Sequence, residues 1–170
     1  MLDGTEQYLA DGGRVMYLGA NGYYWVVSFR DGEPWCMEVR KLDSGSRAWQ
    51  AAPGEYYMAS NGERGGLWRN RGRAPQKLTG VGFASEGMDE CVSYQRMPDS
   101  FDANCAWIFE GVEGDVFGDE GLALGGAAGL EIDRYDLAWG TPPDTYLLAT
   151  AQGFSDKYPH VVEEIMFNVP

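Results

Sequence analysis

Glycine is the residue that most constrains the fold of this chain, because it occupies 24 of the 170 positions. A glycine inside a helix costs up to about 1 kcal/mol relative to alanine, so frequent glycines favour short strands joined by turns over a helical bundle. Six Trp, ten Tyr and seven Phe supply the aromatic side chains that strands accommodate well. We therefore predict an α+β fold, mixed and β-rich, in a single domain covering residues 1–170.

Apolar runs and turn residues predict the individual elements. A helix is expected to end at Gly12 and Gly13, since glycine is common just after a helix C-terminus. A chain that opens on the end of a helix is expected to be part of a longer polypeptide. Strands are expected at 14–19, 23–29, 35–39, 79–84, 91–94, 105–109 and 145–151, and a further helix at 122–135.

Charge is distributed unevenly between the two halves of the chain. Residues 1–80 carry ten Lys and Arg against nine Asp and Glu, whereas residues 81–170 carry three against seventeen. This acidity argues against nucleic-acid binding and favours a solvated surface or a face for a basic partner subunit. No apolar run approaches the roughly 20 residues that cross a bilayer, so no membrane association is predicted. Three widely spaced cysteines suit a cytoplasmic protein.

The common catalytic and phosphate-binding motifs are missing from the sequence. The single histidine, His160, has no G-x-S-x-G motif to accompany it, so a serine hydrolase triad is not expected. No P-loop or dinucleotide-binding glycine motif is present. A charged cluster is interpreted as a salt-bridged helix terminus, and it consists of Glu131, Asp133, Arg134 and Asp136.

The segment 60–73 concentrates one Glu, four Arg, one Trp and four Gly in fourteen residues of an acidic chain. Glycines let a ligand approach the backbone closely, and arginine presents a fork of donors suited to carboxylates and carbonyls. A solvated connection between strands is the alternative, because most such loops bind nothing. The segment is therefore a candidate site loop.

Seven blocks along the chain resemble, in order, the C-terminal region of the large (β) subunit of the N,N-dimethylformamidase family. Each block is short, but their order and their Gly, Trp and Arg positions make the combined signal fairly specific. The resemblance extends over nearly the whole chain. The blocks are 12–25, 38–41, 53–55, 62–69, 80–83, 129–134 and 140–143.

This resemblance implies an amidohydrolase that cleaves N,N-dimethylformamide to formate and dimethylamine. The family's large subunit is several times longer than this chain, has a glutamine-amidotransferase-like α/β region, and binds one ferric iron through two tyrosines and a glutamate. The His-x-Glu pattern that accompanies this glutamate is missing from this sequence. The resemblance thus implies that the iron ligands lie upstream, with none in this chain, and that the isolated chain is inactive.

The resemblance also implies a second glutamate near the iron, which orients or deprotonates water. Glu63, in the Gly-Glu-x-Gly-Gly-Leu-Trp-Arg block, is the candidate for this catalytic role, and Glu55 competes with it. A structural role stays open as well, in which Glu63 pairs with Arg69 or Arg71 to hold the loop.

Tyr23, Trp25, Trp68 and Arg69 are candidate substrate-binding residues. An aromatic wall suits a small amide that offers one strong acceptor and two methyl groups. Because side chains alternate along a strand, Tyr23 and Trp25 would share one face and Tyr24 would occupy the other. At most one set then lines a site, and core packing is the alternative for each residue.

Three functions are compatible with the sequence. The chain is the C-terminal part of an iron-dependent amidohydrolase, or a non-catalytic assembly module, or a relative with the same scaffold and a different amide substrate or no catalysis. The expected partners are the upstream part of the large subunit, a small subunit, and further copies in a homo-oligomer.

Overall fold

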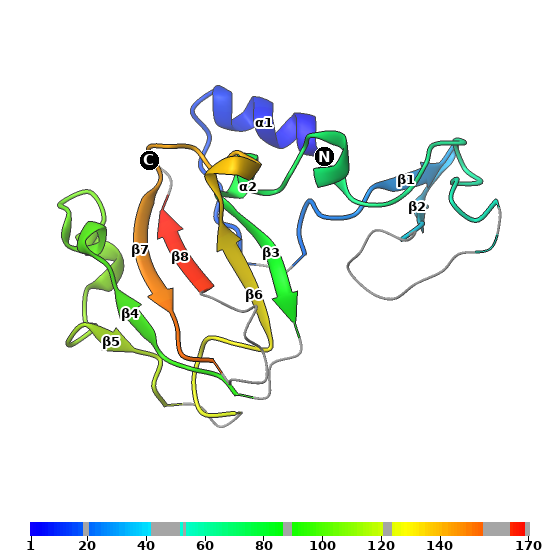
Figure 1. The fold of residues 1–170 in the computed structure, drawn as a ribbon. Coiled ribbons are helices and arrows are strands. Elements are labelled where there is room, and N and C mark those ends of the chain that lie inside the picture. Colours follow the sequence, from blue (N-terminus) through cyan, green and yellow to red (C-terminus); the bar gives the residue numbers. More distant parts are fainter. Residues whose placement is uncertain are drawn as a thin grey trace. The chain divides into compact units, whose positions relative to one another are not determined.

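The structure is a computed structural model that describes residues 1–18, 21–41, 52, 54–86, 90–120, 124–154 and 164–168. The chain divides into two compact units, Met1–Pro75 and Gln76–Pro170. Figure 1 shows that short strands outnumber helices in the described residues. The predicted mixed, β-rich character is therefore confirmed, while the prediction of a single domain stays a prediction.

The first unit contains one helix and one β-hairpin. Helix α1 (Leu2–Ala10) ends at Asp11, and Gly12 follows with a φ of +86°, as the two glycines predicted. Strands β1 (Val27–Arg30) and β2 (Glu33–Val39) pair antiparallel across the turn Asp31–Gly32. Strand β1 begins four residues later than the strand predicted at 23–29, and β2 begins two residues earlier than the strand predicted at 35–39. A single turn of 3-10 helix at Trp68–Arg71 comes near the end of the unit.

The strand predicted at 14–19 is wrong over residues 14–18, which form no regular element. Met16 is 78% exposed and Leu18 is 86% exposed. An apolar run forms a strand only where a neighbouring strand can accept its backbone hydrogen bonds, and none pairs with these residues in the described part of the unit. Sequence periodicity does not reveal this lack of a partner.

The second unit is built on antiparallel strands, several of which lie side by side in Figure 1. Four strands form a sheet in the order β5-β4-β7-β8, and β3 pairs with β6. The strands are β3 (Val81–Glu86), β4 (Tyr94–Arg96), β5 (Val116–Phe117), β6 (Glu131–Tyr135), β7 (Tyr146–Ala151) and β8 (Glu164–Asn168). Helix α2 (Gln76–Thr79) precedes β3, and 3-10 turns lie at Pro98–Phe101, Ala106–Phe109 and Leu137–Trp139.

Strand β7 is the centre of the second unit, because its residues from Leu148 to Ala151 are all buried. Leu148 packs with Cys105 and Phe109, while Ala151 packs with Ile132 and other residues of a second apolar cluster. A strand buried on both faces has a continuous apolar sequence rather than an alternating one. This explains why the run 145–151 predicted β7 correctly.

The strand predicted at 91–94 coincides with β4 only at Tyr94, and two predictions for the second unit are wrong. Residues 106–109 form a 3-10 turn rather than a strand, with Phe109 turned into the core. The helix predicted at 122–135 is replaced in its described part by a bend and then strand β6. Leu124, Gly125, Gly129 and Leu130 all have positive φ, which a right-handed helix cannot contain.

The predicted charged cluster lies on β6 and just beyond it, rather than at a helix terminus. Asp133 stands opposite Phe83 of β3, and burial, with repulsion from Glu131 as a smaller cause, raises the pKa of Asp133 to about 6. The folded protein therefore binds this proton more tightly than the unfolded chain, in which the pKa is near 3.8. It follows that the free energy of unfolding decreases as pH rises from about 4 to about 6.

Replacing Asp133 with Asn is expected to raise the free energy of unfolding at pH 7 by about 1–2 kcal/mol, after allowance for solvent screening. At pH 3.5 the stability difference should fall below about 0.5 kcal/mol, because Asp133 is then mostly protonated in both states. Urea unfolding across this pH range measures the difference. Glu113→Gln, which changes an exposed carboxylate in the same unit, is the control. A stability difference that does not change with pH would contradict the prediction.

Candidate functional site

The glycine- and arginine-rich segment begins within an ordered hairpin of residues 56–65, which we define as the site hairpin. Tyr57 and Arg64 form a β-bridge, and the Met58 amide donates to the Glu63 carbonyl over 2.8 Å. At the tip, the amide of Gly62 donates to the Met58 carbonyl over 2.8 Å, and Gly62 has a φ of +72° that favours glycine. Backbone hydrogen bonds thus define the position of Glu63.

The residues that follow the site hairpin pair with an earlier segment of the first unit. Leu67 forms a bridge with Trp25, and the Trp68 amide donates to the Tyr24 carbonyl over 3.0 Å. The amide of Val26 donates to the Gly66 carbonyl over 2.8 Å. Two of the predicted substrate-binding residues, Trp25 and Trp68, therefore lie on neighbouring paired segments although they are far apart in sequence.

Glu63 has a half-exposed side chain, with 54% of its surface accessible, and it pairs with Arg71. The nearest Arg71 nitrogen, Nη1, lies 3.5 Å from Glu63 Oε2. The other terminal nitrogen of Arg71 donates to the Arg64 carbonyl, so one guanidinium contacts both the carboxylate and the backbone of the site hairpin. Of the two structural pairings considered from the sequence, the structure shows the one with Arg71.

The Trp68 ring lies close to two arginines. The guanidinium carbons of Arg71 and Arg73 are 5.4 Å and 5.5 Å from the centre of its ring, within the range of cation–π attraction. Arg73 also bonds Glu6 at 3.0 Å and Asp3 at 2.6 Å, and these partners raise the pKa of Arg73. Arg71 therefore contacts both Glu63 and Trp68, and Trp68 is one of the predicted substrate-binding residues.

The aromatic residues before β1 do not form the predicted strand, because residues 22–24 form a turn. Tyr24 is buried, whereas Tyr23 and Trp25 are half-buried. Arg69 lies 5.6 Å above the Tyr24 ring, and Lys41 lies 5.2 Å from the Trp25 ring. Tyr23 has a φ of +55°, which is uncommon for a bulky residue, and its hydroxyl lies 3.3 Å from that of Thr5. Arg69 and Tyr23 therefore take part in contacts distinct from the pairing of Glu63 with Arg71.

Glu55, the competing catalytic candidate, lies just before the site hairpin and is exposed. Its Oε2 accepts the Ala52 amide over 2.9 Å, and its own amide donates to the Ala52 carbonyl over 3.0 Å. These two bonds close a local turn. The structure therefore gives Glu55 a local capping role, and among the described residues it forms no ion pair with Arg71 or Arg73.

Glu38 is a residue that the sequence reasoning did not single out. On β2, its carboxylate accepts the amides of Ala59 and Ser60, the Ser60 hydroxyl and the Arg40 Nε, at 2.7–3.0 Å. The Ala59 amide, Arg40 and the two donors of Ser60 lower the pKa of Glu38 to about 2. The only sequence signal was its place in the block 38–41, because three of its four donors come from Ala59 and Ser60, more than twenty positions away.

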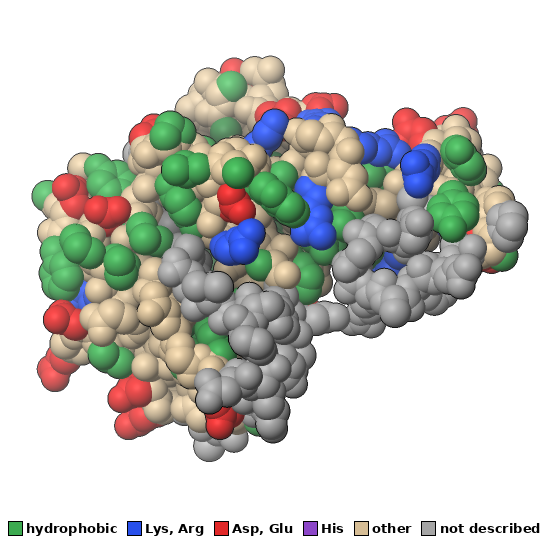
Figure 2. Space-filling model, viewed as in Figure 1, with side chains coloured by type: hydrophobic (Ala, Val, Ile, Leu, Met, Phe, Trp, Pro, Cys, Tyr) green, Lys and Arg blue, Asp and Glu red, His purple; other side chains and the backbone are tan. Residues whose placement is uncertain are grey.

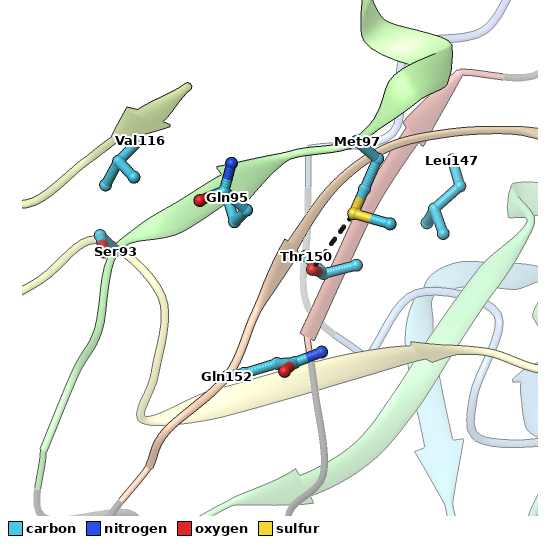
Figure 3. Close-up of a pocket in the computed structure, with 7 residues that line it drawn as sticks. All are labelled: Ser93, Gln95, Met97, Val116, Leu147, Thr150 and Gln152. Carbon is cyan, nitrogen blue, oxygen red and sulfur yellow. Dashed lines mark hydrogen bonds between the residues drawn. The ribbon is translucent and has the colours of Figure 1, made fainter. Parts of the chain in front are cut away.

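Two hollows lie in separate units. One of about 660 Å³ is next to Glu38 and is lined by residues of β1, β2 and the site hairpin, among them Arg30, Cys36 and Ser60. The other, of about 430 Å³, lies on the β4–β7 sheet (Figure 3). Figure 3 shows uncharged side chains only: Ser93, Gln95, Met97, Val116, Leu147, Thr150 and Gln152. The Glu38 hollow is therefore the one that adjoins the site hairpin.

No three His, Cys, Asp or Glu side chains gather as a potential metal centre in the described ranges. His160 lies outside these ranges. The described residues therefore do not form a cluster of this kind that would fit a ferric iron by themselves. Among the described helices, none is both long and apolar enough to span a membrane.

Comparison with known proteins extends over almost the entire chain. Residues 1–167 match the model of the family described as N,N-dimethylformamidase beta subunit-like, C-terminal. The chain is 51% identical over 169 residues to the N,N-dimethylformamidase beta subunits of Paracoccus aminophilus and of an Alcaligenes species. These alignments cover 99% of this chain but 22% of each relative. The family match and the identity together mean that the chain belongs to the N,N-dimethylformamidase beta subunit-like, C-terminal family.

Proposed function

We propose that this chain contributes the site hairpin, with Glu63, to an amidohydrolase that cleaves N,N-dimethylformamide into formate and dimethylamine. The observation that carries the proposal is the 51% identity, over 99% of the chain, to two proteins named N,N-dimethylformamidase beta subunit. The chain spans about a fifth of the length of those relatives. The activity is therefore assigned to a complete subunit, and the isolated chain is expected to be inactive.

In this proposal Glu63 accepts a proton from the water that attacks the amide carbonyl. The C–N bond then breaks, and dimethylamine leaves with the transferred proton. Arg71, 3.5 Å from the carboxylate, orients it. Trp68, together with Trp25, Tyr23 and Arg69, contributes to the walls that receive the amide and its methyl groups.

The proposal also includes a ferric iron, which would be bound by other parts of the longer protein and would polarise the amide carbonyl. The proposed roles of Glu63 and Arg71 do not depend on how that iron is held. A glutamine-amidotransferase-like α/β scaffold and a cytoplasmic location are likewise proposed for the longer protein.

The test is release of dimethylamine from N,N-dimethylformamide by the full-length protein together with its small subunit. Time-dependent release of dimethylamine and formate in equal amounts is the expected result. Acetamide, N,N-dimethylacetamide and formamide serve as comparison substrates. If the metal-loaded protein hydrolyses another amide but not N,N-dimethylformamide, the proposed substrate is wrong and the protein is a member of the family with a different substrate.

A second function, assembly, is favoured by the exposed face of the β1–β2 hairpin. Phe29 and Met37 face each other across the strands, and Trp35 of β2 lies two residues from Met37 on the same face. All three are exposed, Trp35 by 78%, and Figure 2 shows apolar side chains at the surface near this hairpin. In this alternative the chain docks a small subunit or another copy of the large subunit.

Replacing Trp35 with Lys is expected to weaken subunit assembly, because a charge would then have to be desolvated at the interface. Size-exclusion chromatography with light scattering on the full-length protein, with and without the small subunit, measures the change in mass. Trp107→Lys is the matched control, since Trp107 is also exposed but belongs to the second unit. An unchanged assembled mass for Trp35→Lys would remove this hairpin from the interface.

A further inference from the structure

The Glu38 carboxylate binds the tip of the site hairpin from a strand. Oε2 accepts the Ser60 amide and the Ser60 hydroxyl, both over 3.0 Å, and Oε1 accepts the Ala59 amide over 3.0 Å. The Ser60 hydroxyl is also in contact with that of Ser28, the residue opposite Glu38 on β1. Two adjacent backbone amides and one hydroxyl therefore converge on a single charged group.

Arg40 holds the other end of the same hairpin. It stands two residues beyond Glu38, and its Nε donates to Glu38 Oε1 over 2.7 Å. Its carbonyl accepts the Gly66 amide over 2.7 Å. Gly65 packs so closely against Arg40 that an added Cβ would lie 2.5 Å from Arg40 Cβ and closer still to the carbonyl oxygen. The stretch from β2 to Arg40 thus holds both limbs of the hairpin that carries Glu63.

Glu63 lies between these two attachments, three residues after Ser60 and three before Gly66. Its amide bonds the Asn61 side chain over 2.9 Å and its carbonyl bonds Met58, so its backbone follows the tip of the hairpin. A shift of the tip would therefore move the Glu63 carboxylate. Misplacement of a reacting group by about 1 Å can cost on the order of 100-fold in rate.

We propose that Glu38 is a positioning residue for Glu63, acting through its hydrogen bonds to Ala59 and Ser60. The inference rests on the catalytic role proposed for Glu63. Glu38 does not contact the substrate in this proposal. It provides the fixed negative charge that orders the backbone of the hairpin tip, and burial of the Met58 side chain, which belongs to the same hairpin, supports that order.

The test variant is Glu38→Gln, which keeps the shape of the side chain. One of the two oxygens becomes an NH₂ group. This donor then faces the Ala59 amide and Arg40 Nε, or the Ser60 amide, none of which can accept a hydrogen bond, and only the Ser60 hydroxyl could accept from it. The full-length protein with its small subunit should lose roughly tenfold or more in kcat, with KM changed less than threefold. Glu33→Gln on the same strand is the matched control, since Glu33 pairs with an exposed Arg30 and should leave kcat within twofold.

A double-mutant cycle separates positioning from general damage. If Glu38 acts through Glu63, then Glu38→Gln should cost less than threefold in a Glu63→Gln background. A full tenfold loss in that background would overturn the proposal. The proposal would also be overturned if Glu38→Gln had an unchanged kcat while Glu63→Gln was impaired. If Glu63→Gln itself keeps full activity, it is the catalytic role of Glu63 that fails.

Amide hydrogen exchange gives a readout that does not depend on activity. The amides of Ala59 and Ser60 should exchange at least tenfold faster in Glu38→Gln than in the original protein, and β7 amides should not change. If the exchange at Ala59 and Ser60 is unaltered, Glu38 does not order the tip, and the proposal is wrong even if kcat falls.

Discussion

Glu63→Gln is expected to slow the release of dimethylamine from N,N-dimethylformamide by about 100-fold in the full-length protein with its small subunit. Loss of a general base typically costs about 100- to 10,000-fold, and glutamine keeps the shape of the side chain without accepting a proton at neutral pH. The loss should appear in kcat, because Glu63 acts on the attacking water. Binding of the amide should change little.

Glu55→Gln is the matched control for this experiment. Glu55 closes a local turn with Ala52, so its variant should retain activity within about threefold. Arg71→Lys provides an intermediate case, because lysine keeps the charge but cannot bond Glu63 and the Arg64 carbonyl as one planar group. A fully active Glu63→Gln enzyme would leave Glu63 with the loop-holding role, while an inactive Glu55→Gln enzyme would transfer the catalytic role to Glu55.

Gly65→Ala is expected to have the second large effect. A Cβ at this position would overlap main-chain and side-chain atoms of Arg40, and main-chain atoms cannot move away as the end of a flexible side chain can. The hairpin would have to separate from Arg40 by a substantial fraction of an ångström. We expect a loss of about 1–3 kcal/mol in the free energy of unfolding, and a loss of activity of ten- to 100-fold.

Gly4→Ala is the control for the same substitution in open space. Gly4 lies within α1, and nothing stands within 4 Å of the position that its Cβ would occupy. Alanine should stabilise the helix by about 0.5–1 kcal/mol and leave the activity unchanged. Thermal unfolding and dimethylamine release, measured on both variants, test the pair. A Gly65→Ala protein as stable and as active as the original would mean that the contact with Arg40 is not close in solution.

The candidate site was predictable where its signal is local in sequence. The segment 60–73 was identified by its density of Gly, Arg and Trp, and in the structure it contains residues 60–65 of the site hairpin and the arginine contacts of Trp68. The family was also recognised from ordered blocks, and the match to residues 1–167 confirms it. The catalytic and substrate-binding roles of the individual residues stay predictions.

Glu38 could not be found in this way. Its importance depends on Ala59 and Ser60, which lie more than twenty residues away, and a lone glutamate on a strand looks like any solvated charge. The same limit explains the wrong strand at 14–18, where the apolar run is genuine but no partner strand lies beside it in the described part of the unit. It also explains the wrong strand prediction at 105–109, because residues 106–109 form a 3-10 turn that brings Phe109 into the core.

By itself the sequence determined the family, the β-rich character, the turns at glycines and the buried strand β7. Each of these depends on composition or on neighbours within a few residues, which a linear pattern records. Only the tertiary structure decided that Arg71 pairs with Glu63, that Glu38 holds the hairpin tip, and that residues 24–26 pair with 66–68. These arrangements depend on which backbone and side-chain donors and acceptors meet in the folded chain, and local periodicity in the sequence does not record such contacts.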